Sequence, residues 1–124
     1  MPIFTHVVLG TNDLQRAREF YDSVLAPLGI RRVANTEKAS FYGVTAPELM
    51  VTIPANGKPA TAANGGTVSF IAPDSVAVIE FHRRALELGG ICEGPPGPRR
   101  DTAPTAYAAY VRDLDGNKLA TYRF

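Results

Sequence analysis

The sequence repeats itself at an offset of 61 residues. When residues 6–30 are compared with residues 67–91, seven of the 25 positions are identical, whereas unrelated segments of average composition would share about one or two. An internal repeat of this kind predicts a fold built from two copies of one unit. The identical pairs are Val7 and Val68, Asp13 and Asp74, Glu19 and Glu80, Phe20 and Phe81, Leu25 and Leu86, Gly29 and Gly90, and Ile30 and Ile91.

Each copy begins with the pattern of a strand followed by a helix. The runs Ile3–Leu9 and Thr67–Ile71 are rich in residues that favour strands. Asn12 or Asp13 in the first copy, and Asp74 in the second, follow at positions suited to cap a helix. Apolar residues then recur at helical spacing in both copies. In the first copy, Pro27 is expected to end the helix near Ala26.

Three strand-like segments follow each predicted helix. They lie at residues 31–36, 40–44 and 49–54 in the first copy, and at residues 91–93, 107–112 and 118–124 in the second. The segment 94–100 contains three prolines and is predicted to be a loop. Asp113–Asn117 is predicted to be a tight hairpin, in which the aspartates serve the turn.

This order of elements predicts an α+β fold of two tandem βαβββ modules, in which a cup-shaped mixed β-sheet carries the helices on its outside. We expect one domain over residues 1–124, with the first half at about 1–56, a linker at about 57–66 and the second half at about 67–124. The alternative is a ferredoxin-like α+β dimer, which does not naturally produce the repeat.

Composition narrows the possible partners. The formal net charge is +1, which gives no electrostatic reason to expect nucleic acid or an anionic membrane as a partner. No apolar run is long enough to cross a bilayer, and the first residues lack the pattern of a signal peptide. We therefore expect a cytoplasmic protein. The single cysteine, Cys92, has no basic neighbour in the sequence and is expected to be a packed, inert thiol, and His82 is expected at the surface.

Several segments, in order, resemble one known family. Thr5–Leu9 and Phe20–Gly29 resemble its opening strand and helix, Phe70–Asp74 resembles the start of its second unit, and Tyr107–Val111 with Asp113–Asn117 resembles its closing hairpin. The chain is thus similar to the vicinal oxygen chelate superfamily, which includes glyoxalases, bleomycin resistance proteins and extradiol dioxygenases. The resemblance implies the paired βαβββ fold, commonly a homodimer, and in many members a divalent cation held in the cup.

The resemblance also implies where metal ligands would stand. They usually come from the first and last strand of each half, which places them at His6, near Val51, at Thr67 and at Ala120. Only His6 offers a good donor atom, whereas a catalytic metal usually needs about three protein ligands. No metal site and no cofactor are therefore predicted, and a divalent metal held by other ligands such as Glu48 or Asp101 stays an alternative.

The predicted ligand-binding residues follow from the alternation of side chains along strands and from the resemblance. His6 either faces the pocket, where it could bind a ligand or transfer a proton, or is a buried histidine satisfied by hydrogen bonds. Arg100, in the proline-rich loop, could clamp an anion. The full predicted set is Phe4, His6, Val8, Val51, Thr67, Ser69, Arg100, Tyr107, Ala120 and Tyr122.

Three functions remain open at this point. The first is a small-molecule-binding protein of the glyoxalase and bleomycin-resistance type, without the usual catalytic metal, whose mostly apolar pocket would suit a modest organic ligand. The second is an enzyme, a lyase, isomerase or dioxygenase, that depends on His6 as its candidate catalytic residue or on a metal with unusual ligands. The third is a structural or regulatory subunit with no ligand.

Overall fold

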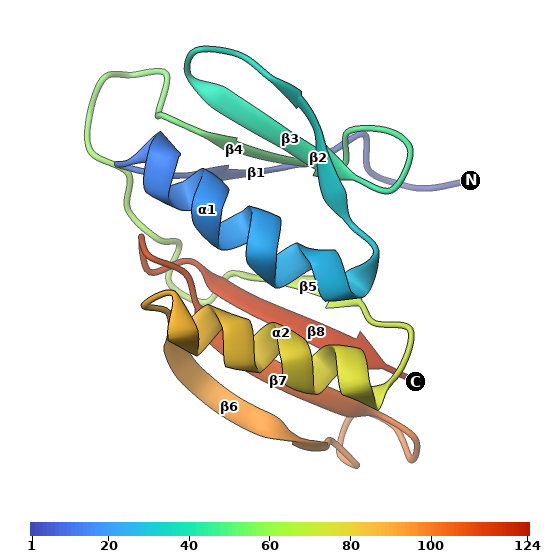
Figure 1. Ribbon diagram of the computed structural model, residues 1–124. Coiled ribbons are helices and arrows are strands. Elements are labelled where there is room, and N and C mark those ends of the chain that lie inside the picture. Colours follow the sequence, from blue (N-terminus) through green and yellow to red (C-terminus); the bar gives the residue numbers. More distant parts are fainter.

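The computed structural model describes all residues, 1–124, and contains two modules that each run strand, helix, strand, strand, strand (Figure 1). The two-module α+β fold predicted from the repeat is confirmed. The first module contains β1 (Val7–Gly10), α1 (Leu14–Leu25), the short 3₁₀ helix η1 (Ala26–Leu28), β2 (Arg31–Asn35), β3 (Ala39–Gly43) and β4 (Leu49–Thr52). The second contains β5 (Thr67–Ile71), α2 (Ser75–Glu87), β6 (Ile91–Pro98), β7 (Tyr107–Arg112) and β8 (Lys118–Arg123).

The two helices begin in the same way. The side chain of Asp13 accepts a hydrogen bond from the backbone N–H of Arg16 at 3.1 Å, and Asp74 accepts one from Ala77 at 2.8 Å. Each carboxylate thereby satisfies an N–H group that has no partner within its helix. At the other end of the first helix, Pro27 lies in η1, so the α-helix stops where it was predicted to stop.

Each module folds its strands into a four-stranded sheet. The strand order is β1-β4-β3-β2 in the first and β5-β8-β7-β6 in the second. The first and last strands of each module are parallel neighbours, with Val7 beside Leu49 in one sheet and Val68 beside Leu119 in the other. The edge strands β1 and β5 have no partner on their outer sides.

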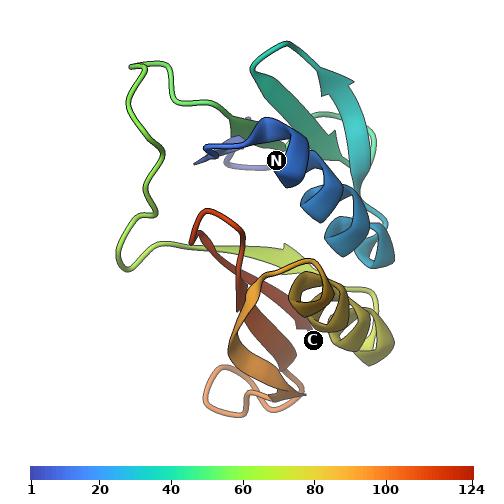
Figure 2. The ribbon, with the colours of Figure 1, turned by 60° about the vertical axis from the view of Figure 1, so that its left-hand side comes forward.

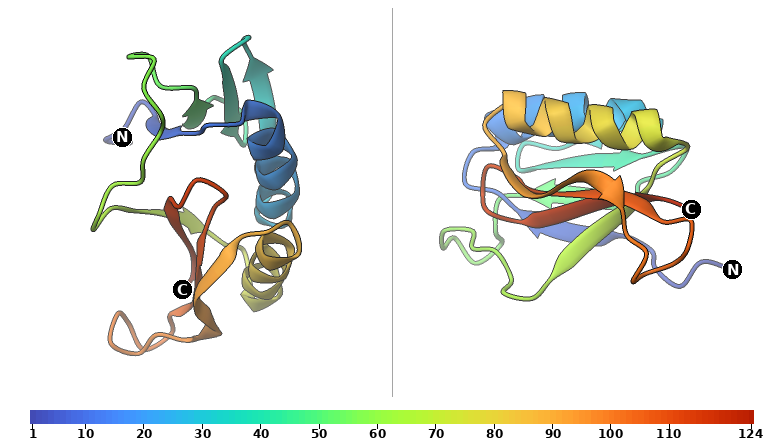
Figure 3. Two further views of the ribbon diagram at one scale, coloured as in Figure 1. Left: turned by 90° about the vertical axis from the view of Figure 1, so that its left-hand side faces the viewer. Right: turned by 90° about the horizontal axis from the view of Figure 1, so that it is seen from below.

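One hydrophobic core serves both modules. Figure 3 shows α1 and α2 lying together on one side of the molecule, with the sheets on the other. The fully buried side chains include Phe20 and Val24 from α1 and Val78 and Phe81 from α2, all within one cluster. Neither helix buries its apolar face alone.

Two sets of polar contacts join the modules. The guanidinium of Arg84 donates to the backbone carbonyl of Ser23 at 2.9 Å. These two residues are separated by the repeat offset of 61, so α1 and α2 cross at equivalent positions. In addition, the hairpin between β7 and β8 reaches the first module, because Asn117 Nδ2 donates to the carbonyl of Gly10 at 3.0 Å. The linking segment 53–66 runs along one side of the molecule between β4 and β5 (Figure 2).

The proline-rich segment corrects one prediction. Residues 94–98 are not a loop but continue β6, which runs from Ile91 to Pro98 along the edge of the second sheet. An edge strand needs backbone donors on one side only, and register irregularities flank Gly94, so the prolines do not have to supply a ladder hydrogen bond. No helix of the structure has both the length and the apolar character that a membrane crossing requires.

Candidate functional site

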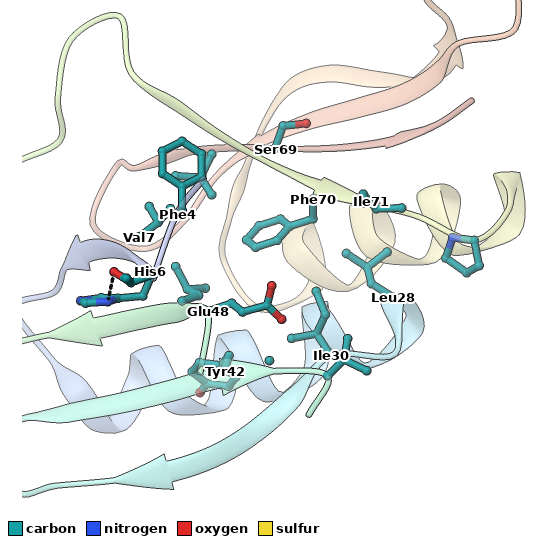
Figure 4. Close-up of a pocket in the computed structure, with 16 residues that line it drawn as sticks. Phe4, His6, Val7, Leu28, Ile30, Tyr42, Glu48, Ser69, Phe70 and Ile71 are labelled. Atoms are coloured by element: carbon teal, nitrogen blue, oxygen red, sulfur yellow. Dashed lines mark hydrogen bonds between the residues drawn. The ribbon is translucent and has the colours of Figure 1, made fainter. Parts of the chain in front are cut away.

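A pocket of about 470 Å³ opens between the two modules (Figure 4). Its walls come from the start of β1, the loop before β4, the exit of α1 and the strand β5. Ten of its 16 lining residues are hydrophobic, which is the usual character of a small-molecule site. The lining residues are Phe4, Thr5, His6, Val7, Leu28, Ile30, Tyr42, Gly43, Val44, Glu48, Leu49, Val68, Ser69, Phe70, Ile71 and Pro73.

The parallel pairing of β1 with β4 brings two ionisable residues to this pocket. Because the backbone N–H of Val7 donates to the carbonyl of Glu48 at 2.9 Å, the residues that precede the two strands lie at the same end of the sheet. His6 and Glu48 therefore reach the pocket although 42 positions separate them in the sequence. Phe70 of β5 faces them from the second module.

The carboxylate of Glu48 points into the pocket, toward the space between Phe70 and Ile30 (Figure 4). It takes part in none of the five salt bridges of the structure and accepts no side-chain hydrogen bond. The imidazole of His6 lies further from Phe70, where its Nδ1 is 3.1 Å from the hydroxyl of Thr5. The pocket thus offers one free carboxylate, one imidazole and several hydroxyl groups among apolar walls.

Three of the residues predicted from the sequence line this pocket, namely Phe4, His6 and Ser69. The others lie elsewhere. Val51 is 1% exposed and belongs to the core, Ala120 is fully buried in β8, and Tyr107 packs against the core beneath the guanidinium of Arg123. Val8, Thr67 and Arg100 are exposed outside the pocket, and Tyr122 lines a second, shallower hollow together with Ser69.

Strand register explains why Val51 lies in the core. In the parallel pair, Val51 stands beside Leu9, and both side chains face the helix layer. Met50, one residue earlier, shares the opposite face with Val8. A shift of one residue therefore moves a side chain to the other side of the sheet.

Sequence reasoning left several lining residues out of the predicted set. Glu48 was considered only as a substitute metal ligand, although its place immediately before a strand was a usable signal. Phe70 was used only for the resemblance to the family, and Leu28 and Ile30 lie at the exit of α1. Phe70 lines the pocket because the helix-facing sides of the sheets form the inner wall of the pocket.

The second hollow lies beside an aromatic cluster on β7 and β8. The rings of Tyr122 and Phe124 stack with centroids 5.5 Å apart, and the hydroxyls of Tyr110 and Tyr122 are hydrogen-bonded to each other. Burial, with the Tyr122 hydroxyl as a second cause, raises the pKa of Tyr110 to about 12. Its phenol is therefore protonated at neutral pH. The ammonium of Lys118 lies 5.2 Å from the centre of the Tyr110 ring.

The structure also corrects the expectation for Cys92. Its side chain is exposed rather than packed, and its Sγ lies 3.1 Å from Nε2 of His82 on α2. Partial burial lowers the pKa of His82. The edge strand β6 brings these residues together, a contact that the sequence neighbours of Cys92 do not indicate.

The donor groups do not fit a catalytic metal within one chain. No group of three or more His, Cys, Asp or Glu side chains comes together, and His6 with Glu48 would supply two ligands where about three are usual. In the second module, the strand positions that correspond to His6 and Glu48 carry Thr67 and Lys118, and an ammonium group repels a cation.

Comparisons with known proteins agree with this architecture. Residues 3–121 match the family model of the Glyoxalase/Bleomycin resistance protein/Dioxygenase superfamily. A crystal structure of a glyoxalase/bleomycin resistance protein from Albidiferax ferrireducens is similar to this chain, with 41% sequence identity, a TM-score of 0.89 and coverage of 99% of each chain. No curated protein matches the sequence significantly.

Two more distant structures share the fold. A lactoylglutathione lyase from Agrobacterium tumefaciens is 24% identical, with a TM-score of 0.67 and coverage of 99% of this chain and 95% of that chain. A fosfomycin resistance protein from Mesorhizobium loti is 18% identical, with a TM-score of 0.70 and coverage of 100% and 93%. At these identities the likeness concerns the fold alone.

Proposed function

The chain belongs to the Glyoxalase/Bleomycin resistance protein/Dioxygenase superfamily, and from this premise we propose that it binds a small organic molecule in the pocket between its modules without using a catalytic metal. The observation that carries the proposal is the pocket itself. Its volume of about 470 Å³ lies in the range of sites that hold drug-sized ligands. Phe4, His6 and Ser69, which the sequence analysis selected, are proposed to contact the ligand.

A binding screen tests this proposal. We expect members of a library of small aromatic compounds to raise the melting temperature of the purified protein, because a ligand that binds only the folded state stabilises it. Phe4→Ala should weaken binding without loss of stability, since Phe4 is 69% exposed. Ile91→Ala is the matched control, because Ile91 is similarly exposed, at 64%, but lies on β6, outside the pocket.

Two results would contradict the proposal. One is a screen in which no compound shifts the melting temperature, which would favour a structural or regulatory subunit. The other is equal weakening of binding by Phe4→Ala and Ile91→Ala, which would place the ligand outside this pocket. Stoichiometric zinc, iron, nickel or manganese in protein purified without chelator would contradict the metal-free part of the proposal.

The proposed assembly is a homodimer. The edge strands β1 and β5 leave one row of backbone groups without strand partners, and exposed edges of this kind favour pairing with another chain. Large apolar side chains stand exposed on or near the same strands, among them Val8, Ile71 and Phe124. A sedimentation mass of one chain at micromolar concentration would contradict this part of the proposal.

Catalysis is the second candidate function, and the shared placement of His6 and Glu48 in one pocket favours it. An imidazole and a carboxylate could remove a proton from carbon and return it to a neighbouring position, as a lyase or isomerase requires. Turnover of the hemithioacetal of methylglyoxal and glutathione, lost in His6→Ala, would support this function. Absence of turnover with this substrate and with catechols would favour binding alone.

A further inference from the structure

We propose that the pocket between the modules selects an amphiphilic cation, an apolar or aromatic body that carries a protonated amine, with Glu48 as its counter-ion. This inference rests on the proposed function and adds the chemical class of the ligand. It follows from the charges of the pocket, from the position of the Glu48 carboxylate and from the aromatic rings around it.

The pocket contains one carboxylate and no lysine or arginine. Among its 16 lining residues, Glu48 is the only aspartate or glutamate, and no lysine or arginine is present. Four other carboxylates of the protein form salt bridges, among them Asp22 with Arg32 and Glu93 with Arg112. Glu48 has no such partner, so its charge is available to a ligand.

The surroundings strengthen the attraction of this carboxylate for a cation. It points toward Phe70 and Ile30 (Figure 4), and apolar walls lower the local dielectric below that of water once a ligand displaces solvent. The faces of aromatic rings also attract ammonium groups, and Phe4 and Phe70 both line the pocket. An anionic ligand would meet the negative charge of Glu48 with no lysine or arginine side chain to offset it.

The apolar walls define the rest of the ligand. Leu28, Ile30, Val68 and Ile71 line the pocket together with the two phenylalanines, and they offer no hydrogen bonds from their side chains. A sugar or a nucleotide would leave many polar groups unpaired against them, which is costly. An alkyl or aryl amine can pack its apolar body against the walls and pair its ammonium group with the carboxylate of Glu48.

Three probes of nearly equal shape test the inference. 4-Phenylbutylamine, 4-phenylbutanol and 4-phenylbutyrate share one apolar body and carry a positive, a neutral and a negative group. We expect the amine to bind about fivefold more tightly than the alcohol, since Glu48 is exposed and ion pairs in contact with water are modest. The butyrate should bind most weakly. Calorimetric titration of the protein at pH 7 measures all three.

The Glu48→Gln variant isolates the charge. The variant should bind the alcohol as tightly as the wild-type protein does, because the amide keeps the shape of the side chain. It should bind the amine no more tightly than the alcohol, because the amide carries no charge. Glu37→Gln is the matched control, since Glu37 is exposed in the turn between β2 and β3 and does not line the pocket. It should keep the fivefold preference for the amine.

The outcomes separate this inference from the proposed function. If the wild-type protein binds the alcohol as tightly as the amine, or if Glu48→Gln keeps the preference, the pocket binds small molecules but does not select cations, and the inference is wrong. If none of the three probes binds, the inference is wrong, and the library screen with the Phe4→Ala control then decides whether the proposed function fails as well.

Discussion

The phenol of Tyr21 on α1 donates a hydrogen bond of 2.5 Å to Oδ2 of Asp113, which begins the hairpin between β7 and β8. This contact crosses from the first module to the second, and both residues are buried. The same carboxylate also accepts hydrogen bonds from the backbone N–H groups of Asp115 and Asn117, at 2.9 and 2.8 Å. Asp113 therefore shapes the hairpin and ties it to the other module.

Removing the phenol should destabilise the protein. Tyr21→Phe deletes a hydrogen bond to a buried carboxylate, and such bonds contribute about 1.5–3 kcal/mol. We expect the free energy of unfolding in urea to fall by about 2 kcal/mol. Tyr107→Phe is the control, because the hydroxyl of Tyr107 makes no hydrogen bond. Equal stability of Tyr21→Phe and wild type would show that Asp113 finds another donor.

Alkaline pH should weaken the fold through the same tyrosine. Burial, reinforced by the neighbouring Asp113, raises the pKa of Tyr21 well above its usual value. The unfolded chain then loses the phenolic proton near pH 10 while the folded protein retains it. Stability is therefore fully present below pH 10 and declines as the pH rises further. Urea unfolding of wild type at pH 8 and pH 10.5 measures this decline, which should be smaller in Tyr21→Phe.

The shared core predicts that equivalent substitutions in the two modules have equivalent effects. Phe20 and Phe81 occupy matching positions of the repeat, and each is no more than 1% exposed. Phe20→Ala and Phe81→Ala should each cost about 3–5 kcal/mol, measured by chemical denaturation. Each variant should unfold in one transition rather than two, because both helices contribute to one cluster. Separate transitions for the two halves would contradict this prediction.

The exposed thiol makes a simple labelling prediction. Cys92 is the only cysteine, so the folded protein should take up one equivalent of iodoacetamide without denaturant. The neighbouring His82, which is available to accept the thiol proton, should make the reaction faster than in His82→Gln. Intact-mass spectrometry measures both rates. No labelling until the protein is unfolded would show that the side chain is covered in solution, as it would be in an interface.

Much of the fold could be predicted because each helix or strand pattern occurs twice, once in each copy of the repeat. Asp13 and Asp74 begin helices at equivalent positions, and a mistake in one copy can be checked against the other. The predictions were wrong where the pairing of strands that are distant in the sequence determines the local structure. Pro95 and Pro96 indicate a loop by local rules, yet they lie in an edge strand whose partner is β7, and only the three-dimensional arrangement shows that the edge tolerates them.

The candidate site was less predictable than the fold for the same reason. The sequence places His6 in one predicted strand and Glu48 immediately before another, and only the parallel register of β1 and β4 brings them to one end of the sheet. Val51 was selected because the resemblance places a site position near it on the last strand of the first half, and an error of one residue reverses the face. Phe4 and Ser69 were placed in the pocket because they lie at or near the strands that border it.

The single core has a consequence for how such a protein could arise. If the 61-residue repeat records a gene duplication, the ancestral polypeptide had half the present length. That shorter chain would have covered the apolar stripe of its helix with its own sheet in part, because the cluster that buries each helix also includes side chains of the other module. Pairing of two identical copies would have supplied the missing side chains, so self-association before the fusion of the two genes fits this core.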